Sequence, residues 1–205
     1  IRQIEGFRKI FKGPMLVWDY TTNFTEYLLP MANLPVLQPN LKYFRDLGVW
    51  YMFEQGNHGG WHGEFAELKG WLISRWLWDP DLDETKLYRR FIEGYYGKAA
   101  APYIYKYIKL LNETIRNSTK SQAVGIWNTV SDRPEYFDDA FLKNAAGLWD
   151  VAEAAVKDDT EKSYNVRMGA LPIRYIQCLK YAKTVNPTSD AQALEKGREY
   201  ARKFI

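Results

Sequence analysis

The chain has 205 residues, 46% of them hydrophobic and 26% charged, with a formal net charge of +3. This composition is typical of a folded domain and excludes a disordered chain. No basic block is interleaved with aromatic residues, and no apolar run approaches the ~20 residues of a bilayer span, so we expect neither a nucleic-acid partner nor a membrane span.

The first part of the chain predicts two parallel strands. Residues 1–11 carry apolar side chains along one side of a predicted helix. Residues 15–20 and 49–54 are apolar runs that turn polar at their ends, as buried parallel strands do. Between them, residues 40–48 have apolar residues at helical spacing and end in Gly48, a typical C-terminal cap. The order strand, helix, strand predicts one βαβ unit.

The next part predicts three helices. The apolar stripe that begins at Phe65 predicts a helix that stops at Asp79-Pro80, because proline disfavours the helical conformation in the residue before it. Asp83 is placed to cap a second helix, which Gly97 ends, and Pro102 suits the first turn of a third. We expect these helices to pack antiparallel.

The remainder is also predicted to be helical, after a turn-rich stretch. Residues 124–134 predict a crossing loop and a sub-boundary, because Trp127 has no periodic partner there. The apolar pattern then predicts helices over residues 138–156, 160–185 and 189–204. Pro172, inside the second of these helices, predicts a kink or a break.

Polar side chains close both predicted strands. Asp19 and Tyr20 end the first strand, and Glu54 and Gln55 end the second. Barrels of alternating strands and helices place their working polar groups where the strands end. Glu54 is therefore the first candidate for a functional site.

Several motifs in this region carry a family resemblance. They are Leu16-Val17-Trp18-Asp19-Tyr20-Thr21-Thr22-Asn23-Phe24, Leu37-Gln38-Pro39-Asn40, Phe53-Glu54-Gln55-Gly56, Gly63-Glu64-Phe65-Ala66-Glu67-Leu68 and Leu77-Trp78-Asp79-Pro80-Asp81. Over residues 14–110 the chain resembles the bacterial glycosidases of the domain-of-unknown-function 4838 family. These include the family 163 endo-β-N-acetylglucosaminidases, which act on N-glycans. More distantly, the chain resembles the end of the family 20 β-hexosaminidase barrel.

The resemblance implies a mostly α fold with a short parallel β portion. Residues 1–63 would form the last two βα units of a (β/α)8 barrel, and residues 64–205 a helical domain. It also implies an oligosaccharide substrate that contains N-acetylglucosamine, no cofactor, and an extracytoplasmic location, in the periplasm or at the surface of a bacterium. Cleavage would be substrate-assisted, with the N-acetyl oxygen of the sugar attacking the anomeric carbon.

The catalytic residues implied by this resemblance follow an earlier barrel strand, which would lie before Ile1. We therefore assign no catalytic residue to this chain and expect it to be inactive without an N-terminal barrel segment of the same protein. Its own contribution would be to bind sugar, through the residues Glu54, Gln55, Asp19, Tyr20, Trp18 and Trp61.

Each of these residues has a chemical reason to contact sugar. The two oxygens of the Glu54 carboxylate can accept strong hydrogen bonds from two hydroxyls of a terminal pyranose, and Gln55 can donate and accept beside it. By pleat parity Asp19 lies opposite to Trp18 and Tyr20, so either the acid or the aromatic pair faces a pocket, and we place Asp19 and Tyr20 both near the rim. Trp61 is the candidate to stack on the apolar C–H face of the sugar ring.

Other interpretations stay open. Glu54 could be the structural ion-pair partner of Arg75, and Trp18 could be a core residue. His58 and His62 lie four residues apart without a third ligand at the usual spacing, so we expect no metal. The whole chain could be an autonomous helical module that binds protein or glycan without catalysis, or it could belong to an α-glucuronidase-like glycosidase.

Overall fold

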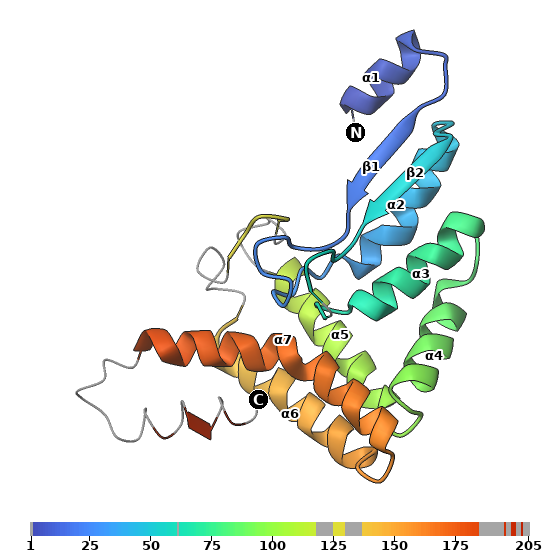
Figure 1. Cartoon of the computed structure of the whole chain (residues 1–205). Helices are drawn as coiled ribbons and strands as arrows, with labels where there is room; N and C mark the ends of the chain where they lie inside the picture. Colours follow the sequence, from blue (N-terminus) through green and yellow to red (C-terminus); the bar gives the residue numbers. More distant parts are fainter. Residues whose placement is uncertain are drawn as a thin grey trace.

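The computed structural model describes residues 2–60, 62–117, 125–129 and 137–184, together with residues 195, 198, 199 and 202. The elements in chain order are α1 (Arg2–Ile10), β1 (Leu16–Tyr20), α2 (Leu34–Asp46), β2 (Tyr51–Gln55), α3 (Ala66–Trp78), α4 (Glu84–Tyr95), α5 (Ala101–Arg116), α6 (Asp139–Ala155) and α7 (Thr160–Thr184). Figure 1 shows α1 and the two strands at one end of the molecule, and α5, α6 and α7 packed together at the other. The described part of the chain is thus mostly helical with a short sheet. Among its helices, none is both long enough and apolar enough to cross a bilayer.

The sheet consists of two parallel strands joined by a helical crossover. Leu16 of β1 lies opposite Tyr51 of β2, and the register continues to Tyr20 opposite Gln55. The predicted βαβ unit is therefore confirmed. The described residues form no further strand, so the sheet has two strands and no closed barrel is formed by them.

The crossover helix α2 is longer than the sequence pattern predicts. It begins at Leu34, well before residue 40, with Pro35 in its first turn and Pro39 inside it. Pro39 lacks a backbone N–H and interrupts the hydrogen-bond ladder. Leu34, Leu37 and Leu41 are all buried on one side of the helix, however, and the burial of this apolar stripe favours the helical conformation through Pro39. Gly48 follows the helix with φ +73°, as its role in the cap predicts.

The helix boundaries in the middle of the chain agree closely with the sequence pattern. Asp83 caps α4 by accepting a hydrogen bond from the Lys86 backbone N–H at 3.0 Å, and Asp138 caps α6 in the same way. Pro102 lies in the first turn of α5. Pro172 was predicted to kink or break this helix, and the break is wrong, because α7 runs as one helix through this residue. The predicted helix over residues 189–204 lies almost entirely outside the described residues.

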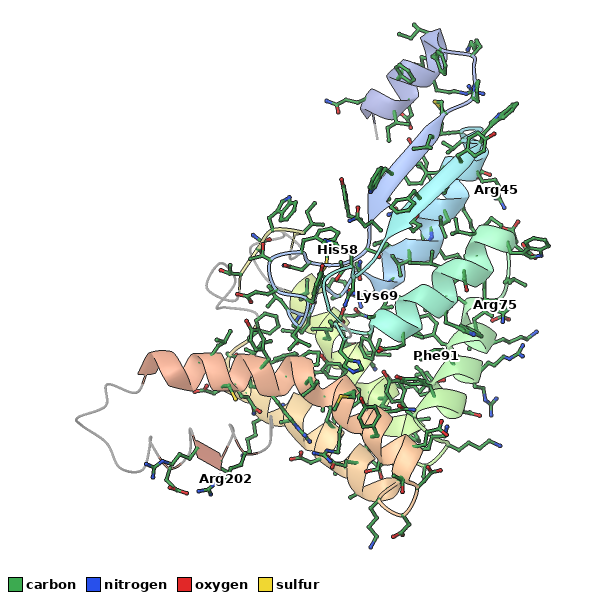
Figure 2. All side chains as sticks on the ribbon, viewed as in Figure 1. Arg45, His58, Lys69, Arg75, Phe91 and Arg202 are labelled. Atoms are coloured by element: carbon green, nitrogen blue, oxygen red, sulfur yellow. The ribbon has the colours of Figure 1, made fainter. Side chains whose placement is uncertain are left out.

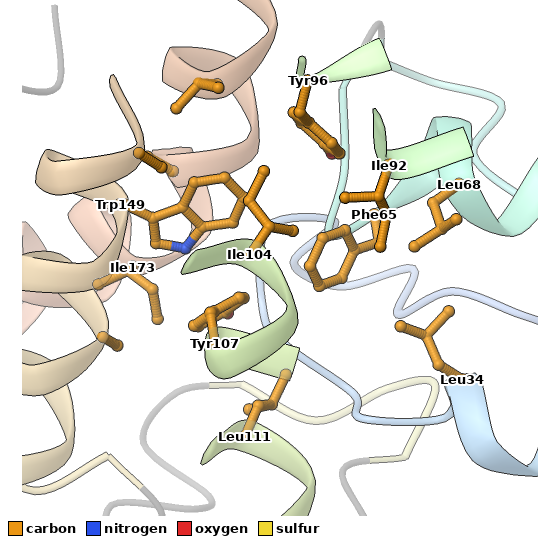
Figure 3. Close-up of a cluster of buried hydrophobic side chains, with 14 of the residues drawn as sticks. Leu34, Phe65, Leu68, Ile92, Tyr96, Ile104, Tyr107, Leu111, Trp149 and Ile173 are labelled. Carbon is orange, nitrogen blue, oxygen red and sulfur yellow. The ribbon is translucent and has the colours of Figure 1, made fainter. Parts of the chain in front are cut away.

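One buried apolar cluster joins the strand-bearing part of the chain to the helical part. Its centre is Trp149 of α6, whose ring lies 5.2 Å from that of Tyr107 on α5 and 6.2 Å from that of Phe65 (Figure 3). Leu34 of α2 and Leu68 of α3 belong to the same cluster. The buried core is therefore continuous from α2 to α7, and α3 and the strands are held against the helical bundle.

Two helical glycines provide a test of how tightly this core is packed. In Gly169→Ala the added Cβ would lie 2.7 Å from the Trp149 ring, so we expect a loss of about 1–3 kcal/mol in the free energy of unfolding. At Gly147 on α6 an added Cβ would meet no heavy atom within 4 Å outside the backbone of its own helix. Gly147→Ala should therefore stabilise the protein by about 0.5–1 kcal/mol. Urea unfolding of the two variants checks this difference. Equal effects would contradict the packing around Trp149.

Candidate functional site

The carboxyl ends of the two strands bring a pair of acidic side chains together. Asp19 of β1 and Glu54 of β2 are direct partners in the parallel register. Side chains directly opposite each other on neighbouring strands point to the same face of the sheet, with Cβ atoms about 5 Å apart. Asp19 accepts a hydrogen bond from the Tyr20 backbone N–H at 2.8 Å. Two carboxylates thus lie side by side at the edge where parallel sheets bind their ligands.

The carboxyl group of Glu54 has no ion-pair partner among the described residues. It forms neither a hydrogen bond nor a salt bridge with any of them. Burial, and after it the negative charge of Asp19, raises the pKa of Glu54 to about 7. The ion pair with Arg75 that one interpretation of the sequence suggested is not formed, because the Arg75 guanidinium lies 5.3 Å from the centre of the Trp71 ring. Glu54 can therefore hold a proton near neutral pH or accept hydrogen bonds from a ligand.

A pocket of about 390 Å³ lies beside Glu54. Thr22 and Asn57, on the loops that follow the strands, contribute polar groups to it, and Ile73 of α3 contributes an apolar wall. The side-chain nitrogen of Asn57 is buried without a hydrogen-bond partner in the described part of the chain. The pocket is large enough for one small polar ligand, with the carboxyl group of Glu54 at its edge.

The wall of the pocket formed by α3 also carries one member of a buried ion pair. Lys69 of α3 lines the pocket, and its ammonium group lies 2.5 Å from a carboxylate oxygen of Glu64. Both side chains are almost completely buried, and the other oxygen of Glu64 has no hydrogen-bond partner among the described residues. Figure 2 places Lys69 at the end of α3 nearest the strand ends, with Arg75 farther along the helix. The local sequence pattern did not reveal this ion pair, although Lys69, next to the buried Leu68, could have indicated a buried partner.

The aromatic residues of the strands face the other side of the sheet. Met52 packs toward the helices, whereas Trp18 and Tyr20 of β1 and Phe53 of β2 point away from them and are 42–56% exposed. The Trp18 indole N–H donates a hydrogen bond of 2.7 Å to the side-chain oxygen of Gln55. Pleat parity thus divides the predicted site: Asp19 and Glu54 are on the helix side, while Trp18, Tyr20 and Gln55 are on the open side. Trp18 is not a core residue of the described chain.

A loop from the helical part of the chain reaches these strand ends. The side-chain nitrogen of Asn23 donates hydrogen bonds to the backbone oxygens of Gly125 and Asn128, at 3.0 and 2.8 Å. The Phe24 backbone N–H donates a further one to the oxygen of Ile126, at 2.8 Å. Trp127 lies on this loop. Sequence analysis could place a crossing loop here but not its contact with the end of β1, because the contact joins residues about a hundred positions apart.

The remaining candidate positions are divided between described and undescribed residues. Trp61 lies outside the described residues. His62 is 3.1 Å from a Glu67 carboxylate oxygen, and the His58 ring packs 5.9 Å from that of Phe24. Within the described ranges, no three His, Cys, Asp or Glu side chains are grouped as a metal would require.

A comparison with known families places the first half of the chain in a group of related sequences. Residues 1–109 match the family described as Domain of unknown function (DUF4838). The chain belongs to this family. The matched residues include both strands, Asp19 and Glu54, and they end within α5, so the loop that carries Trp127 lies beyond them. No curated protein and no solved structure has detectable similarity to this DUF4838 chain.

The raised pKa of Glu54 predicts how stability depends on pH. The folded protein keeps the Glu54 proton up to about pH 7, whereas the unfolded chain loses it near its ordinary value of 4.5. The native state therefore binds more protons between these two values, and Glu54 lowers stability as the pH rises through this window. Allowing for its partial exposure to solvent, we expect Glu54→Gln to stabilise the DUF4838 chain by about 1–2 kcal/mol at about pH 8.5 and to have little effect at about pH 4.

Thermal melts at the two pH values measure this effect as a Tm difference between variant and wild type of about 2–8 °C at the higher pH. The exposed Asp158, which forms no hydrogen bond or salt bridge with another described residue, supplies a matched control as Asp158→Asn. A Tm difference for Glu54→Gln that does not change with pH would contradict the raised pKa.

Proposed function

We propose that this DUF4838 chain is part of a glycoside hydrolase that acts on glycans containing N-acetylglucosamine, and that it supplies sugar-binding residues rather than the catalytic acid. The observation that carries the proposal is the pairing of Asp19 with Glu54 at the carboxyl ends of two parallel strands, beside a pocket. Ligands of α/β proteins bind at this edge of the sheet. The family resemblance in the strand-end motifs supports the choice of a sugar as the ligand.

Glu54 has the chemistry that a terminal sugar requires. Its carboxylate has no partner in the described chain, so its lone pairs are available to sugar hydroxyls. Thr22 and Asn57 line the same pocket and can hydrogen-bond further hydroxyls or the N-acetyl group. Binding a hydroxyl through a desolvated carboxylate favours a tight and oriented contact, because hydrogen bonds to charged groups are stronger than those between neutral groups.

The sheet itself supports the proposal that more of the protein surrounds the site. Each strand pairs on one edge only within the described residues, and large apolar side chains are exposed on the open face. An unpaired edge next to an apolar face favours pairing with further strands. We propose that additional strands of the same protein cover this face, as in a barrel, and that they carry the general acid and the carboxylate that orients the N-acetyl group. Trp18 and Tyr20, on the face opposite Glu54, would then line the interior of that barrel.

A second candidate function is a helical binding module without catalysis. The continuous core from α2 to α7 favours it, because such a core can support an independent fold. The two proposals differ in the state of the isolated chain. A self-contained module should melt cooperatively, whereas a sheet that needs further strands should associate through its exposed edges.

The sugar-binding role of Glu54 is tested by Glu54→Gln in the full-length protein. The variant keeps the shape of the side chain but removes the charge. We therefore expect kcat/KM toward a chitobiose-core N-glycan to fall by a factor that corresponds to about 1.5–3 kcal/mol of transition-state stabilisation. The affinity for N-acetylglucosamine, measured by calorimetry, should fall to a similar extent.

Asp81→Asn is the matched control for this test. Asp81 is an exposed carboxylate that pairs with Arg45 and Lys42 at the surface, and its loss should leave both measurements unchanged. Unaltered kinetics and affinity in Glu54→Gln would rule out the assigned role of Glu54.

A further inference from the structure

Trp127 is an exposed aromatic residue fixed beside the strand ends. Its side chain is 68% exposed, and its ring lies 5.5 Å from that of Phe24. The Phe24 ring lies 5.5 Å from that of Tyr20, the last residue of β1. The rings of Trp127 and Tyr20 are therefore no more than twice this distance apart. The three rings form an aromatic strip that runs outward from the end of β1.

The loop that carries Trp127 is held in place by one buried amide. Asn23 is 1% exposed, and its side-chain nitrogen donates to Gly125 and Asn128 on the loop. Its side-chain oxygen accepts from the backbone N–H groups of Thr25 and Glu26, at 2.9 and 2.8 Å. The two donor hydrogens and both acceptor lone pairs of the amide are thus in use. This network fixes both the end of β1 and the Trp127 loop.

Fixing an indole in an exposed position favours ligand binding over a structural role. A tryptophan that served only packing would bury most of its large apolar surface. Here the backbone around Trp127 is fixed while its ring stays open to solvent, so little conformational entropy is lost when a ligand stacks on it. Hydrogen-bonding groups lie nearby, since the strip includes the Tyr20 hydroxyl and the His58 ring lies 5.9 Å from that of Phe24.

We propose that Trp127 is the stacking platform for a second sugar ring, next to the terminal sugar held at the strand ends. This inference rests on the proposed function and specifies its substrate as an oligosaccharide of at least two residues. An indole face covers the apolar C–H side of a pyranose, and neutral donors and acceptors at its edge bind the hydroxyls. The helical part of the chain, beyond the residues matched by the family, then selects for glycan length.

The test compares two probes in the full-length protein. On this proposal N-acetylglucosamine should occupy only the terminal position, whereas its β-1,4-linked trimer should also reach Trp127. We expect the trimer to bind more tightly than the monomer in the wild type. Trp127→Ala should weaken trimer binding about 10-fold, which corresponds to about 1.4 kcal/mol, and leave the monomer affinity unchanged. Trp127→Phe, which keeps a smaller ring, should bind the trimer with an affinity between those of the wild type and Trp127→Ala.

Trp78→Ala is the matched control. Trp78 is 91% exposed at the C-terminal end of α3, whereas the loop after β2 leads into the N-terminal end of this helix. Its substitution should change the affinity for neither probe. Calorimetric titration gives the affinities, and thermal melts and sedimentation velocity check folding and assembly. A variant that melts below the wild type is replaced in the comparison by Trp127→Phe.

The possible failures of the two proposals are distinguishable. If Glu54→Gln weakens both probes but Trp127→Ala weakens neither, the sugar site stands and the platform is overturned. Equal weakening of monomer and trimer by Trp127→Ala also overturns it, because the residue would then act at the terminal position. A change in sedimentation would make Trp127 a contact with a second copy instead. If the wild type binds neither sugar, both proposals fail.

Discussion

The parallel pairing of β1 with β2 is the constraint on which the rest of the site depends. Successive side chains of a strand point to opposite faces, so the register decides which residues meet. With Leu16 opposite Tyr51, the acids Asp19 and Glu54 become neighbours, and the aromatic residues Trp18 and Phe53 become neighbours on the other face. A slip of one residue would separate both pairs. The two chemical halves of the site, one acidic and one aromatic, are therefore the two faces of a single short ladder.

The position of the ladder depends in turn on the helical core. The chain leaves β2 through a short loop and enters α3 at Phe65, which adopts a left-handed conformation with φ +49°. This conformation costs a non-glycine residue roughly 1–2 kcal/mol. It is offset by burial of the Phe65 ring between Tyr107 and Trp149. The packing of one aromatic ring thus fixes the direction in which α3 begins, and with it the wall of the pocket beside Glu54.

The ion pair next to Phe65 adds a charged constraint at the same point. Glu64 and Lys69 are both buried, and desolvation of two charges is compensated only when they remain together. Their pairing therefore ties the loop after β2 to the first turns of α3. The result is a pocket wall that carries a cation but offers it to Glu64 rather than to the ligand. The Glu54 carboxyl group therefore remains available for binding.

Sequence patterns predict local features of this chain well and its long-range contacts poorly. The cap at Asp83 and the βαβ order follow from residues within a few positions of each other, and the structure confirms them. The early start of α2 was missed because Pro39 counts against a helix locally, while the burial that outweighs it is a tertiary effect. The face of the sheet on which Asp19 lies was left open, since parity is fixed by the strand but its orientation is fixed by the helices that pack on it.

The link between Asn23 and the Trp127 loop shows why such a contact escapes a local pattern and what it does. Asn23-Phe24-Thr25 matches the acceptor pattern for N-glycosylation. In the fold, however, the amide nitrogen that would carry a glycan is buried and donates two hydrogen bonds across a sequence separation of 102 and 105 residues. The asparagine is therefore a structural bridge. Because the bridge begins three residues after β1 ends and reaches a loop of the helical part, any shift of that loop must disturb the end of the strand that carries Asp19. The acidic pair and the aromatic strip are thus positioned by the same hydrogen bonds, which join the residues after β1 to the Trp127 loop.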